Sequence, residues 1–349
     1  MSSPVLSRDW LEQLIDPNAL SSEDRLERLA LLQPEILADT DWLLLAEVIR
    51  KHAIVVPDLD VDVMDVCGTG GSGLSSLNSS TMVALTLSAI PSAPPVVKFG
   101  NRAVSSQSGS FNFLEALGIR ATSPEAVPEW LDKFHVAFVL APDVYPSLAD
   151  LQKARKQLGK PTAFNSLGPL LNPFNPAFQL MGVSNLSALN AFPTVLPVLN
   201  PKLKRGLLVR SHSGLDELHP EESAIVRWVH PDSGGLKIDK KMPRLWPPDD
   251  LPEAFLPCMS LPPAPDLSTL SAQENAALWR RMSQGAPKSD ESPVLQVARA
   301  MVALNAGTAL WLSHHAQSLD QGILQALETL ASGRAWQATQ ALSQNSPLR

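Results

Sequence analysis

The chain has few of the features that mark several large classes of protein. Its 349 residues include two cysteines, Cys67 and Cys258, which lie far apart and lack metal-ligand spacing. This pattern is typical of reduced thiols, so we expect neither a disulfide framework nor a cysteine-bound metal. The formal net charge is -7 and the pI is about 5.5. Because nucleic-acid-binding proteins usually carry a positive surface, the charge disfavours that class.

Signals for membrane insertion or secretion are also missing. No uninterrupted apolar run of about 18 residues occurs. The first residues carry Asp9, Glu12 and Asp16 in place of a basic segment followed by an apolar one. We therefore expect a soluble, cytoplasmic protein.

The most informative stretch is VCGTGGSGLSSLNSST, residues 66–81. It follows the apolar run VDVMDV, which predicts a buried strand, and it leads into an apolar helix. Glycines at 68, 70, 71 and 73 allow backbone N–H groups to crowd an anion, and a helix N-terminus favours phosphate. The stretch matches neither the G-x-G-x-x-G fingerprint nor the Walker motif. It predicts a strand, a glycine turn and a helix start that together bind a phosphate or pyrophosphate group.

A second polar stretch, VVKFGNRAVSSQSGS, lies at residues 96–110. It again begins as a strand and continues with Lys98, Arg102 and four serines. Two neighbouring strand-end loops, one rich in glycine and one cationic, form a clamp suited to a polyanionic ligand.

Further along, the adjacent carboxylates of Asp216 and Glu217 follow a predicted strand, Leu203–His212. Beside a phosphate clamp they suit Mg²⁺, which favours a few carboxylates together with water and substrate phosphate oxygens. The nearby histidines His212, His219 and His230 lack H-x-x-x-H spacing, so a histidine metal site is not expected.

The remaining periodicity predicts scaffold elements. We expect helices at Trp10–Ile15, Leu26–Leu32, Trp42–Ile49, Phe111–Leu117, Leu148–Leu158, Gln273–Met282, Val294–Leu312 and Gln321–Leu342. The run HVAFVL, residues 135–140, predicts a strand with 141–143 as its exit loop. Prolines and glycines predict a turn-rich, mainly structural segment over Phe164–Gly182, and irregular connections or edge strands over Pro231–Pro265.

Four separated motifs together resemble the anthranilate phosphoribosyltransferase family. They are the G-T-G-G loop, the N-x-S-T helix start, the K-x-G-N-R-x-x-S-S-x-S-G run and the later G-L-D-E. The resemblance extends from about Asp65 to the C-terminal helices. It implies an α/β fold with a small N-terminal helical domain, residues 1–60, completed by a helical segment after the first strands. Residues 61–349 would form the larger domain, with a central, mostly parallel sheet flanked by helices.

The resemblance also implies an activity: transfer of the 5-phosphoribosyl group from phosphoribosyl diphosphate to the amine of anthranilate, in tryptophan biosynthesis, by a homodimer with Mg²⁺. The residues implied as catalytic are Lys98, Asn101 and Arg155. Those implied to bind the diphosphate substrate are Gly68, Gly71, Ser72, Ser76, Asn78, Ser79, Ser80, Thr81, Lys98, Gly100, Asn101, Arg102, Ser105, Ser106 and Ser110. Those implied for the acceptor are Gly68, Phe99, Asn101 and Arg155, and those for the metal are Ser80, Asp216 and Glu217.

Two residues depart from the family pattern inside this expected site. Ser72 stands where the family has an acidic residue, and Phe99 stands where it has a histidine. These changes leave open a paralogue that uses a different aromatic acceptor. A pyrimidine-phosphorylase-type enzyme fits less well, because the lysine loop of that family has the sequence K-H-S-G-R, whereas residues 98–102 are K-F-G-N-R. A catalytically silent paralogue that binds a protein or nucleic acid is a further alternative.

Overall fold

One mixed β-sheet organises the chain. The computed structural model describes residues 6–74, 77–101, 109–232, 235–238, 244–246, 267–287 and 291–346. The strands are β1 (Met64–Gly68), β2 (Val96–Gly100), β3 (Val136–Leu140), β4 (Phe178–Gly182), β5 (Arg205–Ser211), β6 (Ala224–Asp232), β7 (Gly235–Ile238) and β8 (Arg244–Trp246).

The strand order is β3-β2-β1-β4-β5-β6-β7, with β8 also paired to β6. The first five strands in this order run parallel, and the pairs that involve β6 are antiparallel. Because parallel strands end at a common edge, the loops that follow β1, β2, β4 and β5 share one side of the sheet. The predicted α/β class with a mostly parallel central sheet is confirmed.

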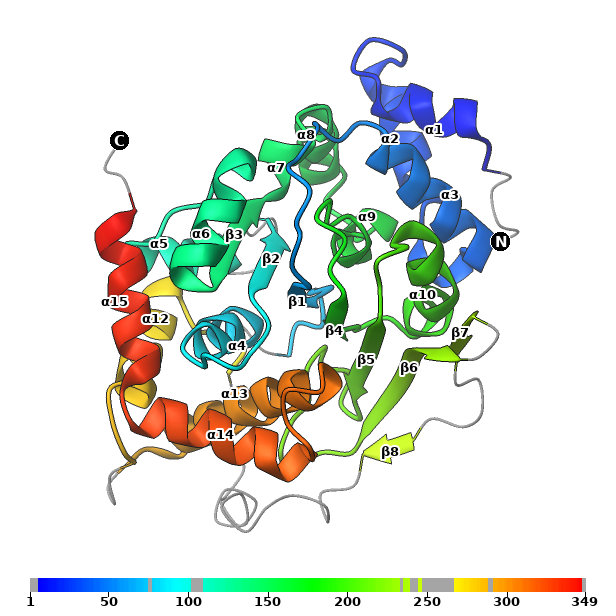
Figure 1. Ribbon diagram of the computed structural model, residues 1–349. Helices are drawn as coiled ribbons and strands as arrows, with labels where there is room; N and C mark the ends of the chain where they lie inside the picture. Colours follow the sequence, from blue (N-terminus) through cyan, green and yellow to red (C-terminus); the bar gives the residue numbers. More distant parts are fainter. Residues whose placement is uncertain are drawn as a thin grey trace.

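Helices cover both faces of the sheet (Figure 1). Those before β4 are α1 (Arg8–Ile15), α2 (Ser22–Leu31), η1 (Pro34–Ile36), α3 (Asp39–Arg50), α4 (Ser79–Ser88), α5 (Ser110–Ala116), η2 (Pro124–Ala126), α6 (Val127–Phe134), α7 (Ala141–Val144), α8 (Leu148–Leu158), α9 (Ala163–Ser166) and η3 (Gly168–Leu170). Those after it are α10 (Leu186–Leu199), α12 (Ala272–Ser283), α13 (Pro293–Leu312), α14 (Leu319–Ala331) and α15 (Arg334–Asn345).

The sheet separates two apolar cores. On one face, α4, α5 and α12 to α15 pack against side chains such as Met64 and Val66 of β1. On the other face, α1 to α3 and α6 to α10 pack against neighbours such as Cys67. Alternate residues of a strand point to opposite faces, so β1 contributes to both cores. The N-terminal helices contact α8 and α10; that residues 1–60 are a separate domain stays a prediction.

Several predicted elements differ from the structure. The segment predicted as a turn-rich loop, Phe164–Gly182, ends in β4, which lies between β1 and β5 in the sheet. The predicted helix Gln321–Leu342 is two helices, because Gly333 adopts a left-handed φ of 81° between α14 and α15. The expected exit loop at 141–143 is part of the short helix α7. Most of Pro231–Pro265 lies outside the described residues.

The helices themselves give no sign of membrane insertion. Within the described ranges, none combines the length and apolar character needed to cross a bilayer.

Candidate active site

The glycine loop after β1 forms the base of the candidate site. Gly70, Gly71 and Gly73 have φ values of 66°, 79° and 70°. Residues with a side chain rarely adopt this left-handed region, so the loop conformation depends on glycine. The predicted sequence of strand, glycine turn and helix is therefore present, with β1 ending at Gly68 and α4 beginning at Ser79.

The carboxylate pair, distant in sequence, lies directly against this loop. The backbone N–H of Gly70 donates to Asp216 Oδ2 at 2.7 Å. A Cβ on Gly68 would lie 2.6 Å from the same oxygen, and a Cβ on Gly182 would lie 1.6 Å from the Asp216 carbonyl oxygen. The loop after β5 can approach so closely only because both strands end in glycine. The structure thus brings the glycine loop and the loop of Asp216 and Glu217 together.

The start of α4 contributes polar groups beside the carboxylates. Ser79, Ser80, Gly182, Asp216 and Glu217 line a cavity of about 10 Å³, which has room for about one water molecule. Ser79 and Thr81 are buried, and their hydroxyls have no hydrogen-bond partner in the described structure. Asn78 is the N-cap residue of α4, and its side chain makes no capping hydrogen bond to the helix.

Lys98 lies beneath these groups and is only 4% exposed. Its Nζ donates to the Val66 carbonyl oxygen at 2.7 Å and to Ser80 Oγ at 2.9 Å. Burial lowers the pKa of Lys98, and the nearby carboxyl of Asp65 opposes that shift. Lys98 therefore joins β1, β2 and α4 and holds the Ser80 hydroxyl.

Two residues of this network were missed by the sequence prediction. Asp65 is fully buried on β1, and burial raises its pKa to about 6 against the opposing charge of Lys98. Asn172, from the turn-rich segment, donates from Nδ2 to Asp65 Oδ2 at 3.0 Å. An aspartate inside an otherwise apolar strand is the signal that indicates a buried cationic partner.

Burial disfavours the charged forms of the carboxyl groups at the site. Burial raises the pKa of Asp216, while the Gly70 N–H lowers it. Burial also raises the pKa of Glu217 well above its usual range, and the neighbouring charge of Asp216 adds to this rise. One oxygen of Glu217, Oε2, is buried and has no partner among the described residues. A divalent cation with hard oxygen ligands would supply the positive charge that these groups need.

Among the described residues, no group of three or more His, Cys, Asp or Glu side chains is placed so that it could hold a metal ion by itself. The carboxylate pair with Ser80 instead suits a hard cation such as Mg²⁺ that would take its other ligands from water or a bound phosphate.

The cationic loop after β2 is described only in part. Gly100 ends β2, Asn101 is exposed, and Ser110 begins α5. Four residues predicted to bind the diphosphate lie outside the described residues: Ser76, Arg102, Ser105 and Ser106.

Two of the predicted acceptor residues, Phe99 and Arg155, lie on the face of the sheet that carries α7 to α10. Phe99 is 5% exposed and meets the ring of Tyr145 edge-on, with 6.0 Å between centroids. Tyr145 is anchored by its hydroxyl, which donates to the Leu171 carbonyl oxygen at 2.7 Å. Phe99 is thus largely a packing residue.

Arg155 lies on α8, half-buried, with its guanidinium 5.7 Å from the centre of the Phe164 ring. It forms no ion pair with any residue that the structure describes, and burial lowers its pKa. A cation held against an aromatic ring without a carboxylate partner is suited to a planar anionic ligand.

Comparison with known proteins agrees with this geometry. Residues 60–336 match the family described as "Glycosyl transferase family, a/b domain". Anthranilate phosphoribosyltransferase from Methanococcus aeolicus is 33% identical over 289 residues, covering 82% of this chain and 80% of the relative. This chain belongs to the anthranilate phosphoribosyltransferase family. The enzyme of that name from Synechococcus elongatus is 33% identical over 345 residues, covering 95% of this chain and 88% of the relative.

Solved structures of the anthranilate phosphoribosyltransferase family have the same fold. The enzyme from Thermus thermophilus superposes with a TM-score of 0.75 at 28% identity, covering 98% of this chain and 96% of that one. The Saccharomyces cerevisiae enzyme in complex with PRPP and Mg gives a TM-score of 0.77 at 23% identity, covering 98% and 93%. The predicted family and the expectation of a transferase are confirmed.

Proposed function

We propose that this protein transfers the 5-phosphoribosyl group of phosphoribosyl diphosphate to the amine of anthranilate and releases pyrophosphate, a step of tryptophan biosynthesis. The observation that carries the proposal is the contact between Asp216 and the Gly70 N–H, which joins the carboxylate pair to the glycine loop. The relatives in this family are named anthranilate phosphoribosyltransferase, which supports the assignment of anthranilate as the acceptor.

The chemistry requires mainly that the leaving group be held. Departure of pyrophosphate builds positive charge on the ribose ring and negative charge on the leaving oxygens. Backbone N–H groups of the glycine loop and the N-terminus of α4 would meet that negative charge, with Ser80 oriented by Lys98. Asn101 and Ser110, at the ends of the second loop, would contact the phosphates from the other side.

Asp216 and Glu217, with Ser80, would hold Mg²⁺, which would neutralise developing charge on the pyrophosphate. The acceptor needs little activation, since an aryl amine is already uncharged near neutral pH. Arg155, whose guanidinium lies over the Phe164 ring, would bind the anthranilate carboxylate through its planar fork. Binding both substrates in line supplies the orientation that the reaction requires.

A different aromatic acceptor is the second candidate. The observation in its favour is Phe99, which packs against Tyr145 and offers no polar ring atom at the position where the family has a histidine.

We also propose that the protein acts in the cytoplasm as a homodimer paired through its N-terminal helices. Light scattering coupled to size-exclusion chromatography would then give twice the 37.6 kDa mass of the chain.

The deciding experiment follows anthranilate fluorescence in the purified protein with Mg²⁺, with and without phosphoribosyl diphosphate. A loss of signal that requires the diphosphate is expected. Calorimetric binding of the diphosphate without any fluorescence loss would favour another acceptor. Absence of both would overturn the proposed reaction and favour a silent paralogue.

A further inference from the structure

We propose that two buried asparagines on the C-terminal helices, Asn275 on α12 and Asn305 on α13, are positioning residues for the two halves of the diphosphate and metal site. The proposal rests on the function proposed above. Neither residue belongs to the sequence motifs that are expected to contact the substrates. Each instead binds the backbone of a loop that carries expected ligands.

Asn305 holds the loop of the carboxylate pair. Its Oδ1 accepts from the Leu218 N–H at 3.2 Å, and its Nδ2 donates to the Leu218 carbonyl oxygen at 2.9 Å. Both ends of the amide thus pair with the residue that follows Glu217. Asn305 also lines the small cavity beside Glu217. A buried amide paired at both ends fixes position and direction together.

Asn275 holds the start of α4. It is fully buried, and its Oδ1 accepts from the Asn78 N–H at 2.9 Å. Its Nδ2 donates back to the Ser271 carbonyl oxygen at 3.0 Å within its own helix. The residues that follow Asn78 are Ser79 and Ser80, so this bond fixes the first turn of the helix that carries the predicted hydroxyl ligands.

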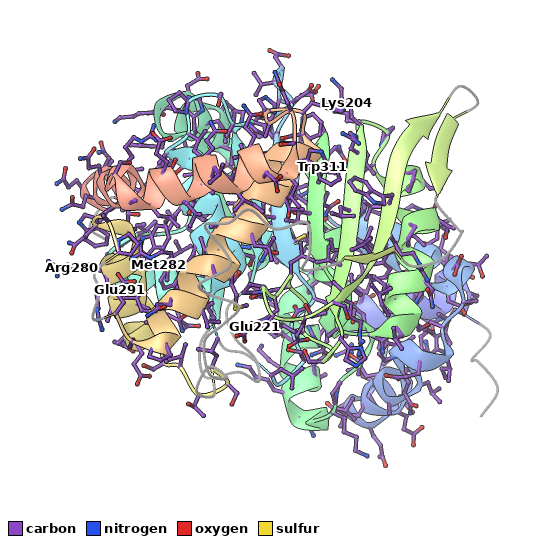
Figure 2. All side chains as sticks on the ribbon, turned by 90° about the horizontal axis from the view of Figure 1, so that it is seen from below. Lys204, Glu221, Arg280, Met282, Glu291 and Trp311 are labelled. Atoms are coloured by element: carbon purple, nitrogen blue, oxygen red, sulfur yellow. The ribbon has the colours of Figure 1, made fainter. Side chains whose placement is uncertain are left out.

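The helices that carry these asparagines are closely packed and are bonded to each other. In Figure 2, α13 lies between the labels of Glu291 and Trp311, and the segment of Glu221 lies beside it. Gly307, close to Asn305, lies so near α14 that an added Cβ would be 2.4 Å from the Ile323 nitrogen. The Arg299 guanidinium pairs with Glu291 at 2.6 Å and donates to the Met282 carbonyl oxygen, which ties α13 to α12. Movement of one loop relative to the other is therefore resisted through the helix pair.

Replacement of either amide by an apolar side chain of similar size leaves backbone polar groups unpaired and releases one loop. We compare Asn305→Leu and Asn275→Leu with Asn200→Leu. Asn200 is a matched control, because it is also buried and also binds backbone, at the Pro176 carbonyl oxygen and the Lys202 N–H, away from the carboxylate loop.

Residue-resolved amide hydrogen exchange in the ligand-free full chain gives the first readout. In Asn305→Leu the Gly70 amide, which donates to Asp216 Oδ2 and does not touch residue 305, should exchange at least about tenfold faster. In Asn275→Leu the Met82 amide, which donates to the Asn78 carbonyl oxygen, should show the same acceleration. The control should change neither amide.

Calorimetry and steady-state kinetics give the second readout. Affinity for phosphoribosyl diphosphate with Mg²⁺ should fall about tenfold in each test variant, with KM for anthranilate unchanged. A merely structural role would lower thermal stability and the active fraction in all three variants while leaving that affinity intact. Adding Asn305→Leu to Glu217→Gln should cost little more than Glu217→Gln alone, because both act through one loop.

The two readouts separate the two proposals. Unchanged exchange at Gly70 and Met82 would overturn the positioning role, whatever the substrate. Failure of the wild-type chain to bind the diphosphate would overturn the proposed function, and the exchange rates would still decide the role of the asparagines.

Discussion

The buried Asp65 and Lys98 place opposite charges between the two cores, directly under the candidate site. Each residue is almost inaccessible to solvent, and each charge reduces the effect of burial on the other's pKa. Such a pair contributes little net stability when intact, but loss of one partner leaves a costly unpaired group. Lys98 therefore has a structural role in addition to its proposed role in binding the diphosphate.

Asp65→Asn should change how stability depends on pH. Burial raises the Asp65 pKa from 3.8 to about 6, so the folded state binds more protons than the unfolded state between these values. Wild-type stability should therefore fall relative to Asp65→Asn as pH rises through this window, by on the order of 3 kcal/mol, and the difference should be constant above it. Urea unfolding of both proteins at pH 4.5 and pH 7.5 would capture about 2 kcal/mol of this change, because pH 4.5 already lies inside the window. A stability difference that is the same at both pH values would contradict the assignment.

Replacing Lys98 alone should impair folding as well as binding. Lys98 is buried and lies near the Asp65 carboxyl, so its loss leaves a buried carboxyl without an opposing charge. Lys98→Met should cost about 3 kcal/mol of unfolding free energy. The double variant with Asp65→Asn should recover most of this loss without recovering diphosphate affinity, as chemical denaturation and calorimetry would show.

At the scale of elements, the glycines that end β1 and β4 decide how closely the carboxylate loop can approach. Gly68 and Gly182 are paired in register across the two strands. Both face Asp216, one through a side-chain oxygen and one through the backbone. The position of the carboxylates therefore depends on the absence of two Cβ atoms.

Gly182→Ala should disrupt this contact. Its Cβ would lie 1.6 Å from the Asp216 carbonyl oxygen, so the loop must move. We expect a loss of about 1–3 kcal/mol in stability and a larger proportional loss of activity. Gly285→Ala, where no atom lies within 4 Å, is the control and should leave both properties nearly unchanged. Differential scanning calorimetry and the fluorescence assay would show whether the two variants differ; equal behaviour would argue against the contact.

The sequence predicted the site's loops better than the elements between them. Gly70 and Asp216 were both identified, because glycine runs and carboxylate pairs have direct chemical meaning. The strand β4 was missed, since its five residues follow a proline-rich segment and lack an alternating pattern. Asn172 and Asn305 were missed for another reason: their hydrogen-bond partners, Asp65 and Leu218, are brought near only by the tertiary structure.

On the scale of the whole molecule, one arginine connects the N-terminal helices to the segment that supports the site. Arg50, at the end of α3, donates to the Leu170 carbonyl oxygen at 3.1 Å and to Asn175 Oδ1 at 2.6 Å. That segment also contains Asn172, which donates to Asp65. The N-terminal helices are thus linked to the buried charges through a short series of hydrogen bonds.

Arg50→Leu should cost about 1.5–3 kcal/mol, because it removes charged hydrogen bonds to partly buried oxygens. Arg8→Leu removes an exposed ion pair with Glu47 and should cost at most about 1 kcal/mol. Guanidinium unfolding of both variants would give the comparison. Equal effects would mean that the Arg50 bonds do not stabilise the junction.

Because one sheet divides the interior into two cores, it also affects how the molecule unfolds. Met64 and Val66 belong to one core and Val63 and Cys67 to the other, so β1 cannot separate from its neighbours without exposing both. The N-terminal helices and the C-terminal helices lie on opposite faces of this sheet and depend on the same strands (Figure 1). We therefore expect the loss of either layer to propagate through the sheet as a single cooperative transition.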